Sequence, residues 1–338
     1  MNERVTLAQG SGGRETEKLI NELFVKNFSN EILDNMTDGA ILKPFRKEIV
    51  VSTDSFVVEP IFYNGGNIGK LSVIGSVNDV LMMGAMPKYI TAGFIISAGL
   101  KIDLLKKIVL SMKKTMKEAN VKLISADTKV IEDTGNGIII NTSCIGEKKI
   151  KNKFPKKIND GDKILISGEI GDHHASIMSE RHNIKNNIKS DNMLLIEIVE
   201  ALIKENINLK IMRDITRGGL ATVLNEIARK ENISFEIDEE EIPIKKKVLS
   251  FSKLLGLDPL TMSNEGKLIA IISKKDSEKA LKIIKKTKAG QAAKIIGFVK
   301  KIKPQNTKNF NDFVLMKTKL KTLRRVRPLE GEGLPRIC

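Results

Sequence analysis

The chain ends in a cysteine on a segment with no helical or strand period. Residues 328–338 read Pro-Leu-Glu-Gly-Glu-Gly-Leu-Pro-Arg-Ile-Cys. Glycine frees the backbone and proline blocks regular ladders, so this sequence predicts a mobile tail. At about 3.3 Å per residue, an extended tail places Cys338 roughly 35 Å from Pro328. A thiol on such a tether is suited to carry a chemical group between sites; the alternative is a frayed terminus without a function.

Two glycine-rich loops precede predicted helices. Residues 9–13 read Gln-Gly-Ser-Gly-Gly, and residues 214–219 read Asp-Ile-Thr-Arg-Gly-Gly. Backbone N–H groups exposed at a helix start bind phosphate, and an arginine there adds a bidentate contact, although many such loops are only turns. A third segment, 65–70, is not a P-loop, because Asn64 stands where that motif has its first glycine and Leu71 where it has Ser or Thr. The candidate phosphate ligands are therefore Gly10, Gly12, Gly13, Thr216, Arg217, Gly218 and Gly219.

Four aspartates lie at the ends of apolar segments or within one: Asp38, Asp54, Asp79 and Asp127. Carboxylates near a phosphate loop are what Mg²⁺ requires at a nucleotide site, whereas any one of them alone is more often a turn or helix cap. Asp79 lies beside Asn78 inside a largely apolar predicted helix. A charge in that setting must be paired or bind a metal.

The elements that position these residues alternate between helix and strand, which predicts an α/β (or α+β) fold. A Lys-rich stretch over 147–160 is the expected linker. It separates a domain over 1–150 from a second over 151–327, followed by the tail over 328–338. Helices are expected over 14–28, 67–83, 102–119, 174–181, 193–204, 219–229 and 277–286. Strands are expected over 49–53, 89–97, 121–125, 138–145, 162–167, 233–237, 267–272 and 293–299.

Composition excludes several classes of protein. The 338 residues are 41% hydrophobic and 29% charged, as in globular proteins, and no apolar run is long enough to predict a membrane span. Two cysteines and no signal-like start favour the cytoplasm, with Cys144 expected to be a buried thiol. The net charge of +16 is spread along the chain, and aromatics are only 4%. Nucleic-acid binding is therefore not expected as the main function.

Several motifs together resemble one family. They are residues 64–85, Asp127-Thr-Lys129, Gly171-Asp-His173, residues 213–219 and the terminal Pro335-Arg-Ile-Cys338. In this order they are similar to the HypE family of hydrogenase maturation proteins, carbamoyl dehydratases of the ATP-dependent PurM-like superfamily. The resemblance covers the whole chain, and its terminal Pro-Arg-Ile-Cys separates this family from relatives that share the nucleotide site.

The resemblance implies a two-domain PurM-like fold whose N-terminal domain forms a homodimer through a shared β-barrel. It implies that the carbamoyltransferase HypF loads a carbamoyl group onto Cys338. ATP with Mg²⁺ then drives dehydration to a thiocyanate, and the HypC–HypD iron scaffold receives the cyanide for a [NiFe] hydrogenase. By resemblance, Lys70 and Asn78 join the nucleotide ligands. The resemblance also implies that Lys129 and Glu265 lie near the thiocarbamate nitrogen. Glu265 accepts a proton either directly or through Lys129, the second route requiring that the metal and burial depress the pKa of Lys129. Which of the two residues acts first stays open.

Three positions depart from the family pattern: Gln9 replaces a common His, His174 a Gly, and Ile215 a Pro. We expect the last two to loosen or re-aim their turns. Three alternatives remain at this point. Selenophosphate synthetase is disfavoured because no reactive Cys lies near the first glycine loop, and thiamine-phosphate kinase has no use for Cys338. A non-catalytic module that only presents its tail has no need of the aspartates and phosphate-type loops.

Overall fold

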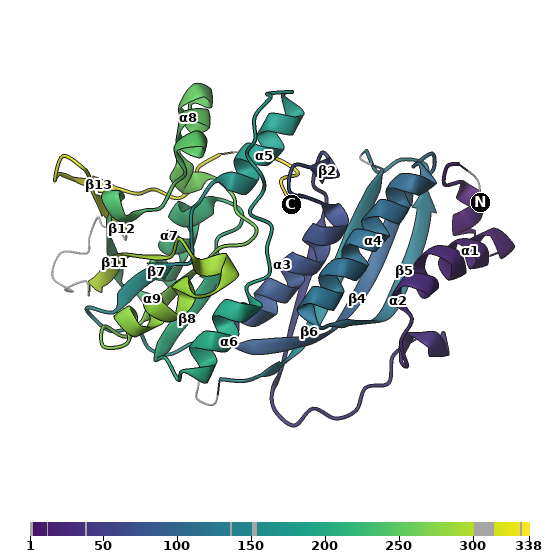
Figure 1. Cartoon of the computed structure of the whole chain (residues 1–338), viewed down its shortest axis with the longest axis horizontal. Coiled ribbons are helices and arrows are strands. Elements are labelled where there is room, and N and C mark those ends of the chain that lie inside the picture. Colours follow the sequence, from purple (N-terminus) through teal and green to yellow (C-terminus); the bar gives the residue numbers. More distant parts are fainter. Residues whose placement is uncertain are drawn as a thin grey trace. The chain divides into compact units, whose positions relative to one another are not determined.

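The computed structural model describes residues 3–11, 13–37, 39–135, 137–150, 154–300, 314–331 and 333–338. The chain divides into two compact units (Figure 1). Unit 1 consists of Met1–Leu81, Ala85–Lys149 and Arg336–Cys338, and unit 2 of Met82–Gly84 and Ile150–Pro335. Each unit has its own β-sheet and helices, which confirms the predicted α/β class. Gly12 and Asp38 lie outside the described residues.

Unit 1 is built on a four-stranded sheet with the order β1-β6-β4-β5. The strands are β1 (Ile49–Phe56), β4 (Ala85–Ser97), β5 (Lys122–Ile131) and β6 (Ile138–Lys148). β4 and β5 run parallel and are joined by the crossover helix α4 (Ile102–Ala119), while the other neighbours are antiparallel. A small pair, β2 (Phe62–Tyr63) and β3 (Gly66–Asn67), leads into helix α3 (Ile68–Met82).

Helices α3 and α4 cover one face of this sheet (Figure 1). They approach closely at Gly69, where an added Cβ meets the Ile108 carbonyl oxygen at 2.3 Å, so only glycine fits. Side chains alternate between the two faces of a strand. The sheet's other face therefore carries the residues that alternate with the buried ones, including the exposed apolar side chains of Ile49, Val51, Ile95 and Ile131.

The N-terminal segment is helical over the range predicted from its period. It comprises α1 (Arg14–Leu19), the π-helical turn η2 (Ile20–Val25) and α2 (Lys26–Phe28), between the 3-10 turns η1 (Leu7–Gly10) and η3 (Leu33–Asn35). Phe24 packs against Phe94 of β4, with ring centroids 4.7 Å apart. This contact attaches the segment to the core of unit 1.

Unit 2 holds a seven-stranded sheet with the order β13-β12-β9-β11-β7-β10-β8. Only β12 and β9 are parallel; the remaining neighbours in the described sheet are antiparallel. The strands are β7 (Lys163–Ile166), β8 (Leu209–Asp214), β9 (Ser234–Asp238), β10 (Leu268–Ile272), β11 (Lys294–Lys300), β12 (Val314–Lys317) and β13 (Leu323–Arg325). All five residues of β10 are buried, as in a strand covered on both faces.

The helices of unit 2 are α5 (Asp172–Arg181), α6 (Ile196–Lys204), α7 (Gly219–Glu231), α8 (Lys246–Leu255) and α9 (Ser277–Lys285), with short 3-10 turns η4 (Glu239–Glu241), η5 (Pro259–Thr261) and η6 (Lys288–Gly290). The apolar face of α7 shares a core with Ile164 and Ile166 of β7 and Ile269 and Ile271 of β10. Helix α8 and strands β8, β12 and β13 were not predicted from the sequence. Residues 147–148 were predicted to belong to the linker, whereas β6 continues to Lys148. In the described parts of the chain, no helix has the length and apolar character needed to cross a membrane.

Candidate functional site

Asp79 is held on the helix-covered side of the unit 1 sheet. It lies in α3, and its Oδ2 accepts a hydrogen bond of 2.6 Å from Ser52 Oγ of β1. Cys144 of β6 is the register partner of Ser52, and its thiol is buried as predicted. Burial, aided by the nearby Asp79 charge, raises the pKa of Cys144 to about 12. Cys144 is therefore a neutral packing residue.

The aspartates predicted at strand ends lie inside strands. Asp54 is the sixth residue of β1 and Asp127 the sixth of β5, so the predicted strand ends at 53 and 125 were wrong. Asp54 shares the α3 side with Asp79, because its Oδ2 lies 3.6 Å from the Cβ position of Gly75 in α3. Asp127 points to the uncovered face. The described residues contain no group of three His, Cys, Asp or Glu placed to hold a metal.

Lys129 and Asp127 form an ion pair on that uncovered face. They are two residues apart on β5, so their side chains project from the same side, with Lys129 Nζ 2.9 Å from the Asp127 carboxylate. The hydrogen bond from Lys129 holds the pKa of Asp127 below its ordinary value. Lys129 is 64% exposed, so the burial that we invoked for it from the sequence is absent in the single chain.

The first glycine loop packs against β5. An added Cβ at Gly10 meets Val130 Cβ at 2.6 Å, so the turn requires glycine, whereas Gly13 has open space around its Cα. Gly13 is the N-cap residue of α1. Further along, Lys70 Nζ donates to the Gly65 carbonyl at 3.2 Å, and Asn78 is buried in α3.

The second glycine loop connects β8 to α7 in unit 2. Gly218 and Gly219 have φ of 74° and 64°, in the region that favours glycine. Gly219 also lies against the Leu260 carbonyl oxygen, 2.5 Å from the position of an added Cβ. Thr216 and Arg217 precede them on the same turn. The loop is a tight strand-to-helix connection, of which the helix start was predicted from the sequence and strand β8 was not.

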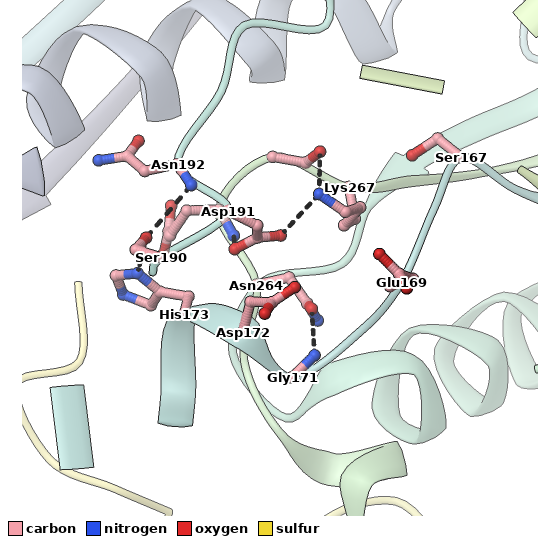
Figure 2. A network of polar contacts seen from close by, with 12 residues as sticks. Ser167, Glu169, Gly171, Asp172, His173, Ser190, Asp191, Asn192, Asn264 and Lys267 are labelled. Atoms are coloured by element: carbon pink, nitrogen blue, oxygen red, sulfur yellow. Dashed lines mark hydrogen bonds and ion pairs between the residues drawn. The ribbon is translucent and has the colours of Figure 1, made fainter. Parts of the chain in front are cut away.

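Glu265 is buried in the loop before β10, together with polar residues that sequence reasoning missed. It is 5% exposed. Its neighbours include Asp191 and Lys267, whose charged atoms are 3.2 Å apart (Figure 2). Asp191 lies in a Lys- and Asn-rich loop without apolar period, so no local pattern marks it.

The end of the chain pairs with the segment that follows β1. The Val57 N–H donates to the Cys338 carbonyl at 3.0 Å, and the Glu59 N–H donates to the Arg336 carbonyl at 2.9 Å. The Arg336 guanidinium lies 3.1 Å from Glu59 Oε2 and donates to the Val57 carbonyl at 3.3 Å. Ile337 between them is buried. The tail's mobility stays a prediction, but in this structure its last residues are docked on unit 1.

The chain is similar to known proteins over its full length. Residues 36–147 match the N-terminal domain of AIR synthase related proteins, and residues 159–303 match their C-terminal domain. Carbamoyl dehydratase HypE from Cupriavidus necator is 39% identical over 346 residues, covering 99% of this chain and 95% of the relative. The chain belongs to the HypE family of carbamoyl dehydratases.

Solved structures of the HypE family agree with this fold. Hydrogenase maturation protein HypE in complex with ATP superposes with a TM-score of 0.93 at 40% identity, covering 98% of this chain and 99% of that one. A chain of a HypE–HypF complex superposes with a TM-score of 0.78 at 41% identity, covering 92% of this chain and 99% of that one. Thiamine monophosphate kinase from Aquifex aeolicus shares the fold alone, at 16% identity and a TM-score of 0.60.

Two departures from the HypE family pattern take part in hydrogen bonds that hold their loops. The Ile215 N–H donates to the Lys267 carbonyl at 2.9 Å, a bond that proline cannot make, and its side chain is buried. The His174 N–H donates to the Ser263 carbonyl at 3.2 Å, while His174 Nδ1 accepts from the Ser263 N–H at 3.3 Å. Both departures bind the loop that carries Glu265.

The third departure is also accommodated. The Gln9 side chain accepts a hydrogen bond of 2.9 Å from the Thr6 N–H, closing a capping box on η1. Gln9 is 2% exposed, so its amide is part of the turn that shapes the first glycine loop.

Proposed function

We propose that this chain dehydrates an S-carboxamide on its own Cys338 to a thiocyanate, with conversion of ATP to ADP and phosphate. Full-length membership in the HypE family supports the reaction. The docked tail is the structural observation that carries the proposal. It seats the cysteine backbone beside Val57, whose Cα lies about 10 Å along the chain from the Cα of Asp54, three residues earlier.

An amide oxygen is a poor leaving group, which explains the need for ATP. Transfer of the γ-phosphoryl group to that oxygen converts it into a phosphate, and the C–O bond then breaks as phosphate departs. The two N–H protons must leave the nitrogen as the C≡N bond forms, so a base has to lie close to it. The sum is R–S–CO–NH₂ + ATP → R–S–CN + ADP + phosphate.

Lys129 and Glu265 are the proposed catalytic pair. Glu265 is a buried carboxyl group suited to accept a proton, and Lys129 is a cation on a strand that also carries Asp127.

For the nucleotide we propose the glycine-loop residues Gly10, Gly12, Gly13, Thr216, Arg217, Gly218 and Gly219, together with Lys70 and Asn78. The predicted Mg²⁺ ligands are Asp38, Asp54, Asp79 and Asp127, of which Asp54 and Asp79 share one side of the sheet. This fits Mg²⁺, which is usually held by one or two carboxylates plus substrate phosphates. When bound, the ion neutralises phosphate charge.

The proposed partners follow from the same family. A HypE–HypF complex is among the similar structures, which supports HypF as the source of the carbamoyl group. We further propose that the cyanide passes to HypC–HypD. We also propose that the protein is a homodimer and acts in the cytoplasm. The uncovered sheet face of unit 1, with Val51 and Ile95 exposed on it, supports the shared β-barrel.

The test is a single-turnover reaction. The protein is carbamoylated by HypF, freed of it, mixed with Mg-ATP, and its C-terminal peptide weighed. We expect loss of one water from the modified Cys338. ATP consumption without that loss refutes the proposal. Cys338→Ala should bind ATP and show no modification, while Lys129→Ala and Glu265→Gln should convert the carboxamide only at a small residual rate.

A further inference from the structure

Glu265 is held by a buried polar network that nothing in the family resemblance assigns. Its N–H donates to Asp191 Oδ1 at 3.1 Å. The other oxygen of Asp191 lies 3.2 Å from Lys267 Nζ, and Lys267 Nζ donates to the Gly266 carbonyl at 3.2 Å. One carboxylate therefore binds both ends of the tripeptide 265–267. Figure 2 shows its contact with Lys267.

Gly266 brings the two loops into direct contact. A Cβ added there lies 2.0 Å from the Asp191 carbonyl oxygen, so no other residue fits without moving the backbone. The Ile215 N–H bond to the Lys267 carbonyl and the Asn264 N–H bond of 3.1 Å to the Ile215 carbonyl hold the other side of the segment. The Cα of Glu265 is thereby fixed between two loops distant in sequence.

Asp191 is itself held in place. The preceding Ser190 places its Oγ 2.8 Å from His173 Nδ1 and accepts from the Asn192 N–H at 3.2 Å. The side chain of Asp191 is only 3% exposed. Burial alone raises the pKa of Asp191, but the surrounding charges, Lys267 first, outweigh it and leave this pKa below its ordinary value. The carboxylate is thus ionised and oriented from both sides.

The geometry points to Asp191 as a positioning residue that, with Lys267, sets where the Glu265 carboxyl group stands for the dehydration. A buried ion pair is a poor source of stability, because apolar residues of similar size commonly do as well. What the pair provides here is a fixed backbone position next to a proposed base. Misplacement of a reacting group by about 1 Å can cost roughly 100-fold in rate. The inference rests on the proposed role of Glu265.

A second buried pair in unit 2 provides a matched control. Asp162 accepts a hydrogen bond of 2.8 Å from the Asn159 N–H and lies 3.9 Å from Lys210 Nζ, with side chains 6% and 8% exposed. By the register of β7 and β10 it lies at the opposite end of β10 from Lys267, roughly 20 Å away along the strand direction. Loss of this pair tests stability alone.

The experiment measures single-turnover conversion of the carbamoylated full-length protein, its KM for ATP and its melting temperature. We expect Asp191→Asn, which keeps an acceptor for the Glu265 N–H, to lose about tenfold in rate, and Asp191→Ala about 100-fold. The KM for ATP should stay within about twofold. Asp162→Asn and Asp162→Ala should lower the melting temperature comparably and leave the rate unchanged.

A combined variant separates positioning from a general effect. If Asp191 acts through Glu265, Glu265→Gln with Asp191→Asn converts no more slowly than Glu265→Gln alone. The inference is overturned if the rate losses of the two single variants multiply in the double variant, or if folded Asp191→Ala converts at the wild-type rate. Either result leaves the dehydratase proposal intact. Failure of the wild-type protein to convert, or full activity of Glu265→Gln, refutes the underlying proposal and this inference with it.

Discussion

Two aspartate–lysine pairs in this chain have similar lengths and opposite surroundings. Asp127 and Lys129 are 2.9 Å apart on β5, with side chains 68% and 64% exposed. Asp191 and Lys267 are 3.2 Å apart, with side chains 3% and 10% exposed. Water screens the first pair, so its members can exchange partners at little cost. The second pair cannot be separated without leaving a charge in the interior.

The difference matches the roles proposed for the two regions. A residue that must meet a substrate gains from weak contacts that are easily replaced, and Lys129 has them. A residue that must hold a loop gains from contacts that are costly to break, and Asp191 has them. On these proposals, the same two chemical groups serve different purposes in exposed and in buried surroundings.

The largest expected effect comes from breaking the buried pair. Lys267→Met should lower the free energy of unfolding by about 3–5 kcal/mol, because Asp191 then lacks its countercharge. Lys129→Met should change it by less than about 0.5 kcal/mol. Urea unfolding of the two variants measures both values. Equal losses would show that burial does not distinguish the pairs.

Removing both buried charges sharpens the comparison. Asp191→Leu with Lys267→Met should recover at least half of the stability lost by Lys267→Met, since no isolated charge remains. The rate of dehydration should not recover, because the Glu265 N–H has lost its acceptor. A double variant that regains activity as well as stability would mean that the pair serves folding only.

The sequence could supply much of the fold because several elements are strongly periodic. The amphipathic α4 runs from Ile102 to Ala119, the predicted range, and the α/β class is confirmed. Strands β1 and β5 were predicted too short because polar residues interrupt their apolar runs, Asp54 and Ser55 in β1 and Asp127 to Lys129 in β5. Helix α8 was missed because it begins with Lys246 and Lys247, which carry no apolar period.

The site was only partly predictable, for a physical reason. Glycine loops and carboxylates carry local signals, so Gly218, Gly219 and Asp79 could be singled out from spacing. Asp191 meets Glu265 across 74 positions, through a pairing of two irregular loops. No period or motif in one sequence encodes such a contact, and the tertiary fold alone creates it.

A smaller effect concerns His174, which is hydrogen-bonded to Ser263 in the same loop that the Asp191–Lys267 pair holds. Burial lowers the pKa of His174 from 6.5 to about 4, so the folded protein holds it neutral. The unfolded chain binds this proton near pH 6.5, and stability therefore falls as the pH drops from about 6.5 to about 4 and levels off below. The loss is at most about 3 kcal/mol.

His174→Asn keeps an acceptor near the Nδ1 position and removes the titration. Chemical unfolding of wild type and His174→Asn at pH 7 and pH 4.5 measures how much stability each protein loses. The contributions of the carboxylates are common to both proteins and cancel in the comparison. Wild type should lose more stability than the variant over this range. The same pH dependence in both proteins would contradict a buried neutral His174.

The smallest effect belongs to the exposed pair. Lys129 holds the pKa of Asp127 below its ordinary value mainly through their hydrogen bond, so Lys129→Met should raise this pKa toward that value. A carboxyl-carbon NMR titration of Asp127 measures the change, and high salt should weaken the wild-type shift. An unchanged titration would show that the pair does not form in solution. Lys129 would then be available to the substrate without first leaving Asp127. The difference between this exposed lysine and the buried, ion-paired Asp191 would be greater.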